Sequence, residues 1–319
     1  ETEDAILSAF HGDAKIACIG PAGEIGVHYA CIVNDKHRAA GRSGVGMVMG
    51  SKNLKAVAVR GTGGVKVANP KAYRDVALEA YGMLKENPVT GEGLGALGTA
   101  VLVNVMNQSG GLPTRNAQTG TFDGAEAISG ETLASSYLKR NKSCMGCIIS
   151  CGRVTKIVDN KYAGSGEGPE YETLWAIGAA CGISDLAAIT KANYICNEAG
   201  MDTITFGSTV GCAMELFQKG LVSEEDIGMA LNFGDSDAMV KLAVDPPGQF
   251  ALDIGKIDNP SRVAIYLSAD VDTYKKRVAV QSTALMTFWD MRQQVSGFEG
   301  ELFVDFHVGA LCVQGWCRR

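Results

Sequence analysis

The chain has 319 residues, of which 46% are hydrophobic and 20% are charged, and its formal net charge is −6. This is enough for about two domains with a hydrophobic core, and the acidic balance without a basic stripe argues against nucleic-acid binding. We expect no membrane span, and the acidic first four residues differ from a signal peptide. Ten cysteines without such a signal indicate a reducing compartment, which we take to be the cytoplasm.

The first 70 residues predict short strands separated by glycine-rich turns. Residues 15–19 form a buried-strand pattern, residues 25–33 fit either a helix or a strand, and residues 54–60 alternate as a strand that ends at a glycine cluster. A domain boundary is expected near residue 70. Because the chain starts without methionine in an acidic segment, we also expect that a domain precedes it.

Two glycine-rich segments in this region are candidates for ligand binding. Gly20, Gly23 and Gly26 form G-x2-G-x2-G, which differs from the dinucleotide-binding order G-x-G-x2-G, so we favour a structural turn. Residues 41–50 place Arg42 among small residues, where backbone N–H groups are accessible beside a guanidinium. Phosphate or pterin oxygens would suit that arrangement.

From residue 70 the apolar residues recur with helical spacing. The best-defined helix spans residues 184–199, where Ser184 can serve as the N-cap and Gly200 as the left-handed residue after the last turn. Cys196 lies on the apolar face of that helix, so we expect a core residue rather than a ligand. Residues 139–142, Lys-Arg-Asn-Lys, are expected to form a solvated turn. In total, helices are expected over residues 70–85, 131–139, 170–179, 184–199 and 209–219.

Three closely spaced cysteines, Cys144, Cys147 and Cys151, form the pattern C-x2-C-x3-C. Four thiolates hold a cubane iron–sulfur cluster, so the pattern predicts a cluster with one further cysteine, for which Cys312 is a candidate. A zinc site is less favoured because no second short Cys or His pair follows. Reduced core cysteines rarely cluster in this way, and His307 is expected to be a core or surface residue rather than a ligand.

Residues 168–173 place Glu170 and Glu172 just after a glycine-rich loop and close to the cysteines in sequence. Such a pair of carboxylates could move protons. From this motif alone we favour the alternative, an acidic first helical turn that interacts with the helix dipole. After residue 226 the pattern weakens, with one more helix expected at residues 271–291.

Together these segments resemble the tungsten-containing aldehyde:ferredoxin oxidoreductase family, in order, over roughly the first 225 residues. The resemblance implies an α+β fold. Residues 1–70 would be the remnant of a β-rich tungstopterin-binding N-terminal domain, residues 71–226 a helical domain with the cluster cysteines, and residues 227–319 an incomplete or divergent C-terminal helical domain. The similar segments are residues 19–24, 34–60, 112–116, 128–132, 144–153, 168–178 and 192–220.

The resemblance also implies three cofactors: a tungsten bis-pterin, a [4Fe–4S] cluster, and Mg²⁺ that bridges the pterin phosphates. It makes Cys144, Cys147 and Cys151 cluster ligands, and it favours Cys312 over Cys317 as the fourth because Leu311-Cys312 matches the end of the family's C-terminal motif. The aspartate and glycine of that motif align with His307 and Ala310, although Asp305, two residues upstream, could supply the aspartate after a small shift.

Three further positions are carried over as pterin contacts. The resemblance places Arg42 with Ser43 against the pterin phosphates or the cluster-side pterin, and Asp202 at a hydrogen bond to the pterin ring system. A buried aspartate would otherwise be hard to explain. Two departures are that the chain starts well inside the family's N-terminal domain and that residues after 226 lack its glycine-rich C-terminal segment.

The implied activity is oxidation of an aldehyde to a carboxylic acid, with electrons passed through the cluster to ferredoxin. Glu170 or Glu172 would accept a proton near the metal, and the sequence does not choose between them. The alternatives are the tungsten subunit of a class II benzoyl-CoA reductase and a non-catalytic iron–sulfur electron-transfer subunit. A homodimer or hetero-oligomer is compatible with the family.

Overall fold

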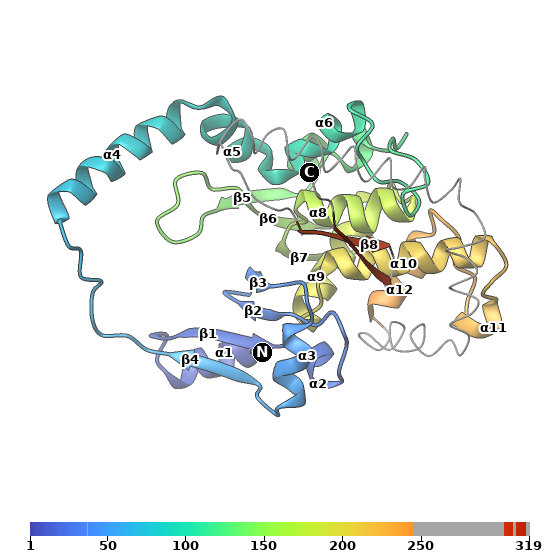
Figure 1. The fold of residues 1–319 in the computed structure, drawn as a ribbon, viewed down its shortest axis with the longest axis horizontal. Helices are drawn as coiled ribbons and strands as arrows, with labels where there is room; N and C mark the ends of the chain where they lie inside the picture. The colour runs from blue at the N-terminus through green and yellow to red at the C-terminus, as the bar shows by residue number, and fades with distance from the viewer. Residues whose placement is uncertain (37, 245–302, 309–310, 317–319) are drawn as a thin grey trace.

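A computed structural model describes residues 1–36, 38–244, 303–308 and 311–316, the last two ranges for their backbone alone. Figure 1 shows a small unit of strands and short helices at the N-terminus, an extended connection to a long helix, and a helical part built around a second small sheet. The expected α+β class is confirmed by this mixture of helices and small antiparallel sheets.

The N-terminal unit is a four-stranded antiparallel sheet in the order β3-β2-β1-β4. The strand predicted at residues 15–19 is confirmed as β1, and the strand predicted at residues 54–60 is the shorter β4. Residues 25–33 form neither one helix nor one strand, because a turn precedes β2. The elements are α1 (Thr2–Ala9), β1 (Lys15–Ile19), α2 (Pro21–Glu24), β2 (Ile32–Asn34), β3 (Arg38–Ala40), α3 (Val45–Ser51) and β4 (Ala56–Val59).

Close backbone packing explains the glycine spacing that resembled a nucleotide-binding loop. A Cβ atom on Gly20 would lie 2.2 Å from the carbonyl oxygen of Ala199, and one on Gly50 would lie 1.9 Å from that of Gly23. The N–H of Cys31 donates to the carbonyl oxygen of Gly200 at 2.8 Å. These glycines let the N-terminal unit dock against the end of a core helix, as a structural role requires.

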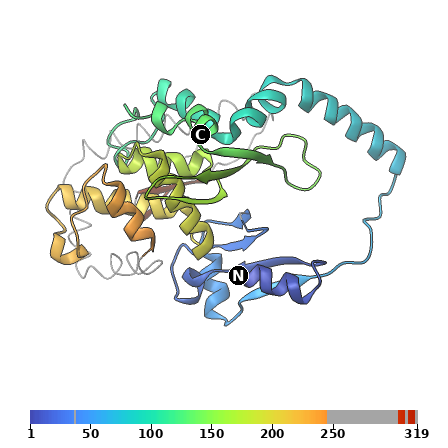
Figure 2. The same ribbon diagram turned by 180° about the vertical axis from the view of Figure 1, so that it is seen from behind.

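An exposed linker leads to α4 (Pro70–Glu86), which stands away from the rest of the chain in both Figure 1 and the reverse view in Figure 2. The helix predicted at residues 70–85 is thus confirmed. It begins at Asn69, whose Oδ1 accepts from the N–H of Ala72 at 3.1 Å, and Pro70 occupies the first turn. None of its side chains is buried by the described part of the chain.

The run Pro88–Gln108 is the one helical run among the described residues with the length and apolar composition of a membrane span. The expectation of no such run is therefore wrong. The run is not one regular helix, because Gly98 has φ +64° and ψ −162°. It consists of a π-helical turn (Pro88–Gly93), α5 (Leu94–Leu97), a 3-10 turn (Gly98–Val101) and α6 (Leu102–Gln108).

Two long helices form the centre of the helical part, and both begin at aspartates. Asp185, rather than the expected Ser184, caps α9 (Leu186–Ala199) by accepting from the N–H groups of Ala187 and Ala188. Gly200 follows with φ +72°, as predicted, and Cys196 is fully buried in the core. The predicted helix at 209–219 begins earlier, as α10 (Thr203–Gln218), because Asp202 caps it.

Shorter helices complete the fold. The helix expected over residues 131–139 ends early, as α7 (Gly130–Ser136), and the helix expected over residues 170–179 is divided into α8 (Tyr171–Thr173), a π-helical turn (Leu174–Gly178) and a 3-10 turn (Ala179–Cys181). The other helices are α11 (Glu224–Ile227) and α12 (Ser236–Val244).

The second sheet has the order β5-β6-β7, with strands β5 (Leu138–Lys142), β6 (Gly152–Ile157) and β7 (Gly164–Glu167). Residues 139–142 therefore lie in a strand and not in the expected turn, because β5 pairs antiparallel with β6. A Cβ atom on Gly166 would lie 2.9 Å from the ring of Tyr194, so the glycines of β7 let α9 pack closely against the sheet.

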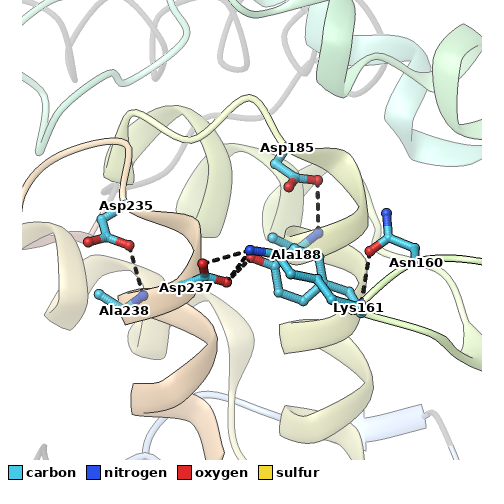
Figure 3. A network of polar contacts seen from close by, with 8 residues as sticks. Asn160, Lys161, Asp185, Ala188, Asp235, Asp237 and Ala238 are labelled. Carbon is cyan, nitrogen blue, oxygen red and sulfur yellow. Dashed lines mark hydrogen bonds and ion pairs between the residues drawn. The ribbon is translucent and has the colours of Figure 1, made fainter.

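The connection between β6 and β7 is tied to α12, as Figure 3 shows. The Nζ atom of Lys161 lies 2.6 Å from Oδ2 of Asp237, and the hydroxyl of Tyr162 donates to the same carboxylate. The pair is largely exposed, so it contributes little stability and mainly sets the position of the helix. Asp235 accepts from the N–H of Ala238 at 2.9 Å at the start of α12.

Near the C-terminus the backbone forms an antiparallel hairpin of β8 (Phe303–Val308) and β9 (Leu311–Trp316). Its register places Cys312 opposite His307. The helix expected at residues 271–291 lies outside the described residues.

A substitution of Gly207 tests the packing of α10. A Cβ atom there would lie 2.4 Å from the carbonyl carbon of Ala176, so we expect Gly207→Ala to destabilise the fold by about 1–3 kcal/mol in chemical denaturation. The matched control, Gly82→Ala in α4, meets no atom within 4 Å and should stabilise the chain by up to about 1 kcal/mol. Equal effects of the two substitutions would contradict the described packing.

Candidate functional site

The three cysteines of the C-x2-C-x3-C motif lie on the loop that connects β5 to β6, which we call the thiol loop (residues 143–151). The loop turns tightly, since the N–H of Cys147 donates to the carbonyl oxygen of Cys144 at 3.1 Å and Gly146 has φ +73°. Cys144 is exposed, whereas Cys147 and Cys151 are partly buried, and all are free thiols. One short segment thus presents three soft sulfur donors at one end of the sheet.

The thiols are not held in the geometry of a metal site. Among the residues whose side chains the structure describes, no group of three His, Cys, Asp or Glu side chains converges as metal ligands. The fourth predicted ligand, Cys312, lies in β9, where only the backbone is described. The fit to an iron–sulfur cluster therefore rests on the donor set and on the charged groups beside the loop.

Arg38 extends from β3 of the N-terminal unit to the thiol loop. Its Nη2 atom would lie 3.3 Å from a Cβ atom on Gly152, the residue after Cys151. This Nη2 is buried and has no hydrogen-bond partner among the described residues. A buried donor of this kind is costly unless it is satisfied, and an anionic cluster on the thiol loop would satisfy it. The residues present therefore fit the group.

The charges around Cys151 act in opposite directions on its thiol. Burial raises its pKa, the carboxylate of Glu170 raises it further, and the positive charge of Arg38 lowers it. A thiol in such a position favours the thiolate only when positive charge or a bound metal ion compensates the burial.

Glu170 belongs to the same side of the site as the thiol loop. Its carboxylate accepts a hydrogen bond from the hydroxyl of Thr99, which itself accepts from the N–H of Tyr171 at 2.9 Å. Burial raises the pKa of Glu170, while the Thr99 hydrogen bond and the charge of Arg38 lower it. Glu170 occupies the N-cap position of α8 but makes no side-chain capping bond, so the helix-turn explanation does not account for its carboxylate.

Glu172 lies on a different side, with Arg42 and Asp202. The indole N–H of Trp175 donates to Oε2 of Glu172 at 2.6 Å. Glu172 is exposed as a residue, but partial burial of its carboxylate raises the pKa. The hydrogen bond from Trp175 and the positive charge of Arg42 lower that pKa. The charge of Asp202 raises the pKa of Glu172 slightly further.

The burial of Asp202, which we expected to be hard to explain without a pterin contact, has a structural reason. Its Oδ2 accepts from the N–H and the hydroxyl of Thr205 at 2.7 and 2.6 Å, so it caps α10. Its Oδ1 lies 3.3 Å from where a Cβ of Gly41 would stand, so this oxygen faces the loop that carries Arg42. Arg42 and Ser43 are both exposed, and Ser43 has φ +79°.

The structure therefore divides the predicted residues into two groups with different partners. The thiol loop and Glu170 form one group, and Arg42, Asp202 and Glu172 form the other. The sequence analysis missed Arg38, Arg153, Thr99 and Trp175. Trp175 could have been found, because it follows Glu172 by three residues, whereas Thr99 and Arg38 come close only through the fold.

Comparison with known proteins gives two matching family models and a set of relatives. The model described as the N-terminal domain of aldehyde ferredoxin oxidoreductase matches residues 1–61, and the model for its domains 2 and 3 matches residues 75–245. The tungsten-containing aldehyde ferredoxin oxidoreductase of Pyrococcus abyssi is 53% identical over 230 residues, and that of Pyrococcus furiosus is 50% identical over 234 residues.

These matches cover 72% and 73% of this chain but only 37% and 38% of the two relatives, so the chain spans less than half of their length. A more distant relative, the WOR-like subunit of the aliphatic sulfonate oxidoreductase of Pyrococcus furiosus, is 32% identical over 84% of the chain and 43% of that protein.

Among solved structures, the active-site complex BamBC of benzoyl coenzyme A reductase with 1,5-dienoyl-CoA matches with a TM-score of 0.62. It is 23% identical and covers 82% of this chain and 43% of that chain, which shows a shared fold. Since the two family models together account for most of the sequence, and the larger alone for more than half of it, the chain belongs to the aldehyde ferredoxin oxidoreductase family.

Proposed function

We propose that this chain is part of a tungsten-containing oxidoreductase that oxidises an aldehyde to a carboxylic acid and passes the electrons to ferredoxin. The observation that carries the proposal is that Glu170 interacts with Cys151 of the thiol loop, whereas Glu172, two residues on, interacts with Arg42 and Asp202. The group for electron transfer and the group for proton transfer would thus lie close together. The identity to tungsten-containing relatives supports the same activity.

The residues would hold the cofactors as follows. Cys144, Cys147 and Cys151, with Cys312 as the fourth ligand, would hold a [4Fe–4S] cluster, and Arg42, Ser43 and Asp202 would contact the tungsten bis-pterin, whose phosphates Mg²⁺ would bridge. When bound, the tungsten bis-pterin supplies two-electron oxidation and the cluster supplies one-electron transfer.

Glu172 is the stronger candidate for the proton acceptor. Oxidation of an aldehyde with water yields the carboxylic acid, two electrons and two protons, so a base is needed beside the reacting carbon. Glu172 lies with Arg42 and Asp202, the residues proposed to contact the pterin, and Trp175 fixes its carboxylate by a hydrogen bond of 2.6 Å. Arg42 favours the ionised form, which is the form that accepts a proton.

The N-terminal unit would be the remnant of a larger β-rich tungstopterin-binding domain over residues 1–70. The helical domain with the cluster cysteines would span residues 71–226, and residues 227–319 would be an incomplete or divergent C-terminal helical domain. The protein would be cytoplasmic, because exposed thiols such as Cys144 persist in a reducing compartment. A homodimer or a complex with another subunit would complete it.

Ferredoxin fits the surface beside the thiol loop. Lys139 and Arg140 are exposed on β5, an edge strand of the described sheet that leads directly into the loop, and Met145 is 96% exposed at the loop tip. A basic strand next to an accessible loop suits a small acidic electron carrier, since complementary charge accelerates encounter.

Two alternatives are tested by the same preparations. The fold shared with BamBC favours the tungsten subunit of a class II benzoyl-CoA reductase, so aldehydes and benzoyl-CoA should be compared as substrates. Elemental analysis of the anaerobically purified protein decides whether it is catalytic. Iron and sulfide of one cubane with tungsten support the proposal; the cubane without tungsten or molybdenum supports a non-catalytic electron-transfer subunit, and no iron overturns both.

Glutamine at position 172 should remove the proton acceptor. We expect Glu172→Gln to lower aldehyde turnover by about 10²–10⁴-fold with tungsten and iron content unchanged. Glu170→Gln should lower it less, and the exposed Glu198→Gln serves as the matched control without effect. Unchanged turnover in the 170 and 172 variants would remove both glutamates from the mechanism.

Loss of the indole donor should change the pH dependence. Without the hydrogen bond from Trp175, the pKa of Glu172 rises further, so the carboxylate forms only at higher pH. We expect Trp175→Phe to move the acidic limb of the kcat/KM profile for the aldehyde to higher pH. An acidic limb at the same pH as in the unsubstituted protein would show that another group controls it.

Reversal of the charge on β5 should weaken the encounter with ferredoxin. The double variant Lys139→Glu with Arg140→Glu is expected to raise the KM for ferredoxin roughly tenfold at low ionic strength, and to leave turnover with a small viologen dye unchanged. The control, Lys71→Glu with Arg74→Glu on the exposed α4, makes the same change in net charge. Equal effects of both pairs would assign the change to net charge alone.

A further inference from the structure

Arg153 is an arginine whose side chain is almost completely enclosed. Arg153 lies in β6 and is 2% exposed. It is the largest of the fully buried side chains in the described part of the chain. Its two terminal nitrogens donate to four neutral oxygens. These are the carbonyls of Leu94, Gly95 and Ala96 at 2.8, 2.7 and 3.0 Å and Oδ1 of Asn141 at 2.8 Å.

No carboxylate of the described residues forms an ion pair with this guanidinium. Glu167 accepts instead from the backbone N–H of Arg153 at 3.1 Å, and Glu170 is held by Thr99. A guanidinium remains protonated even when buried, so the chain holds a full positive charge in its interior. Such a charge is expensive unless an opposite charge lies close by.

The carboxylates of Glu170 and Glu167 act on this guanidinium through space without bonding to it, and so does the Cys151 thiol of the adjacent thiol loop. The thiol loop can therefore supply a further opposite charge. Arg153 follows Cys151 by two residues, and a Cβ atom on Gly98 would lie 2.9 Å both from Nε of Arg153 and from the carbonyl oxygen of Cys151. The backbone at Gly98, with φ +64°, therefore lies against the guanidinium and against the end of the thiol loop at the same point. Nε of Arg153 is buried without a partner among the described residues.

We propose that Arg153 is a positioning residue that compensates the negative charge of a cluster on the thiol loop and raises its reduction potential. The proposal rests on the function proposed above, because it requires the cluster. The hydrogen bonds from Arg153 to the carbonyls of residues 94–96 hold the guanidinium in place, so its charge cannot move away when the cluster is reduced.

The sign follows from electrostatics. A cubane held by thiolates is anionic, and it gains one more negative charge when it accepts an electron. A fixed positive charge in a poorly solvated interior stabilises the reduced form more than the oxidised form. Removal of that charge should therefore make the cluster harder to reduce. If Arg153 only stabilised the fold, its replacement would lower the stability of the protein without this change in the reduction potential of the cluster.

The test is an EPR-monitored redox titration of the anaerobically purified holoenzyme. In Arg153→Gln we expect the cluster midpoint potential to become more negative by at least a tenfold change in the reduction equilibrium, which is 59 mV for one electron. Arg153→Lys retains a positive charge and should recover at least half of the shift. Arg74→Gln removes an exposed charge from α4, which stands away from the thiol loop, and should leave the potential unchanged.

The outcomes separate this proposal from the proposed function. If the unsubstituted protein contains no iron–sulfur cluster, the proposed function fails. If it contains the cluster and Arg153→Gln leaves the potential unchanged, or the Gln and Lys variants shift it equally, the role of Arg153 is overturned. If the Gln variant loses its iron while the Lys variant keeps it, the role in setting the potential is overturned, because Arg153 would then be needed to retain the cluster.

Discussion

The burial of one positive charge at the start of β6 organises the candidate site. Arg153 can be enclosed only because three successive carbonyls, Leu94 to Ala96, and the side chain of Asn141 surround its guanidinium. The α5 segment must therefore stay against the sheet, and the left-handed Gly98 must turn directly over the end of the thiol loop. Through these contacts the position of Cys151 depends on the packing of α5 and Gly98 against the sheet.

A second constraint is the brevity of α8. Glu170 precedes this helix and Glu172 lies within it, and their side chains bond to different partners. Thr99 holds the first towards the thiol loop, while Trp175, in the π-helical turn that follows, holds the second beside Arg42. Irregular helical turns of this type are frequent at functional sites because they redirect side chains that a regular helix would place elsewhere.

The junction between the N-terminal unit and the core helices brings Arg42 and Asp202 to the same part of the candidate site. Gly20 packs directly on the backbone of Ala199, and the carbonyl of Gly200 accepts from Cys31. This contact brings the loop with Arg42 towards the start of α10, where Asp202 satisfies the helix N-terminus with one oxygen and faces Gly41 with the other. The same residue thereby stabilises a helix and stands at the candidate pterin side, so its burial alone is no evidence for a cofactor.

The sequence predicts the helices α4 and α9, the strand β1 and the three thiols of one loop, because these depend on short-range periodicity, on Gly200 and on local cysteine spacing, and its resemblance to the family implies the α+β class. It misjudged residues 139–142, since strand pairing with β6 overrides their polar composition. The fold places Arg38 and Arg153 beside the thiol loop and gives Glu170 and Glu172 different partners. The partners that decide these positions, such as Thr99 and Glu170, lie far apart in the chain, and only packing brings them together.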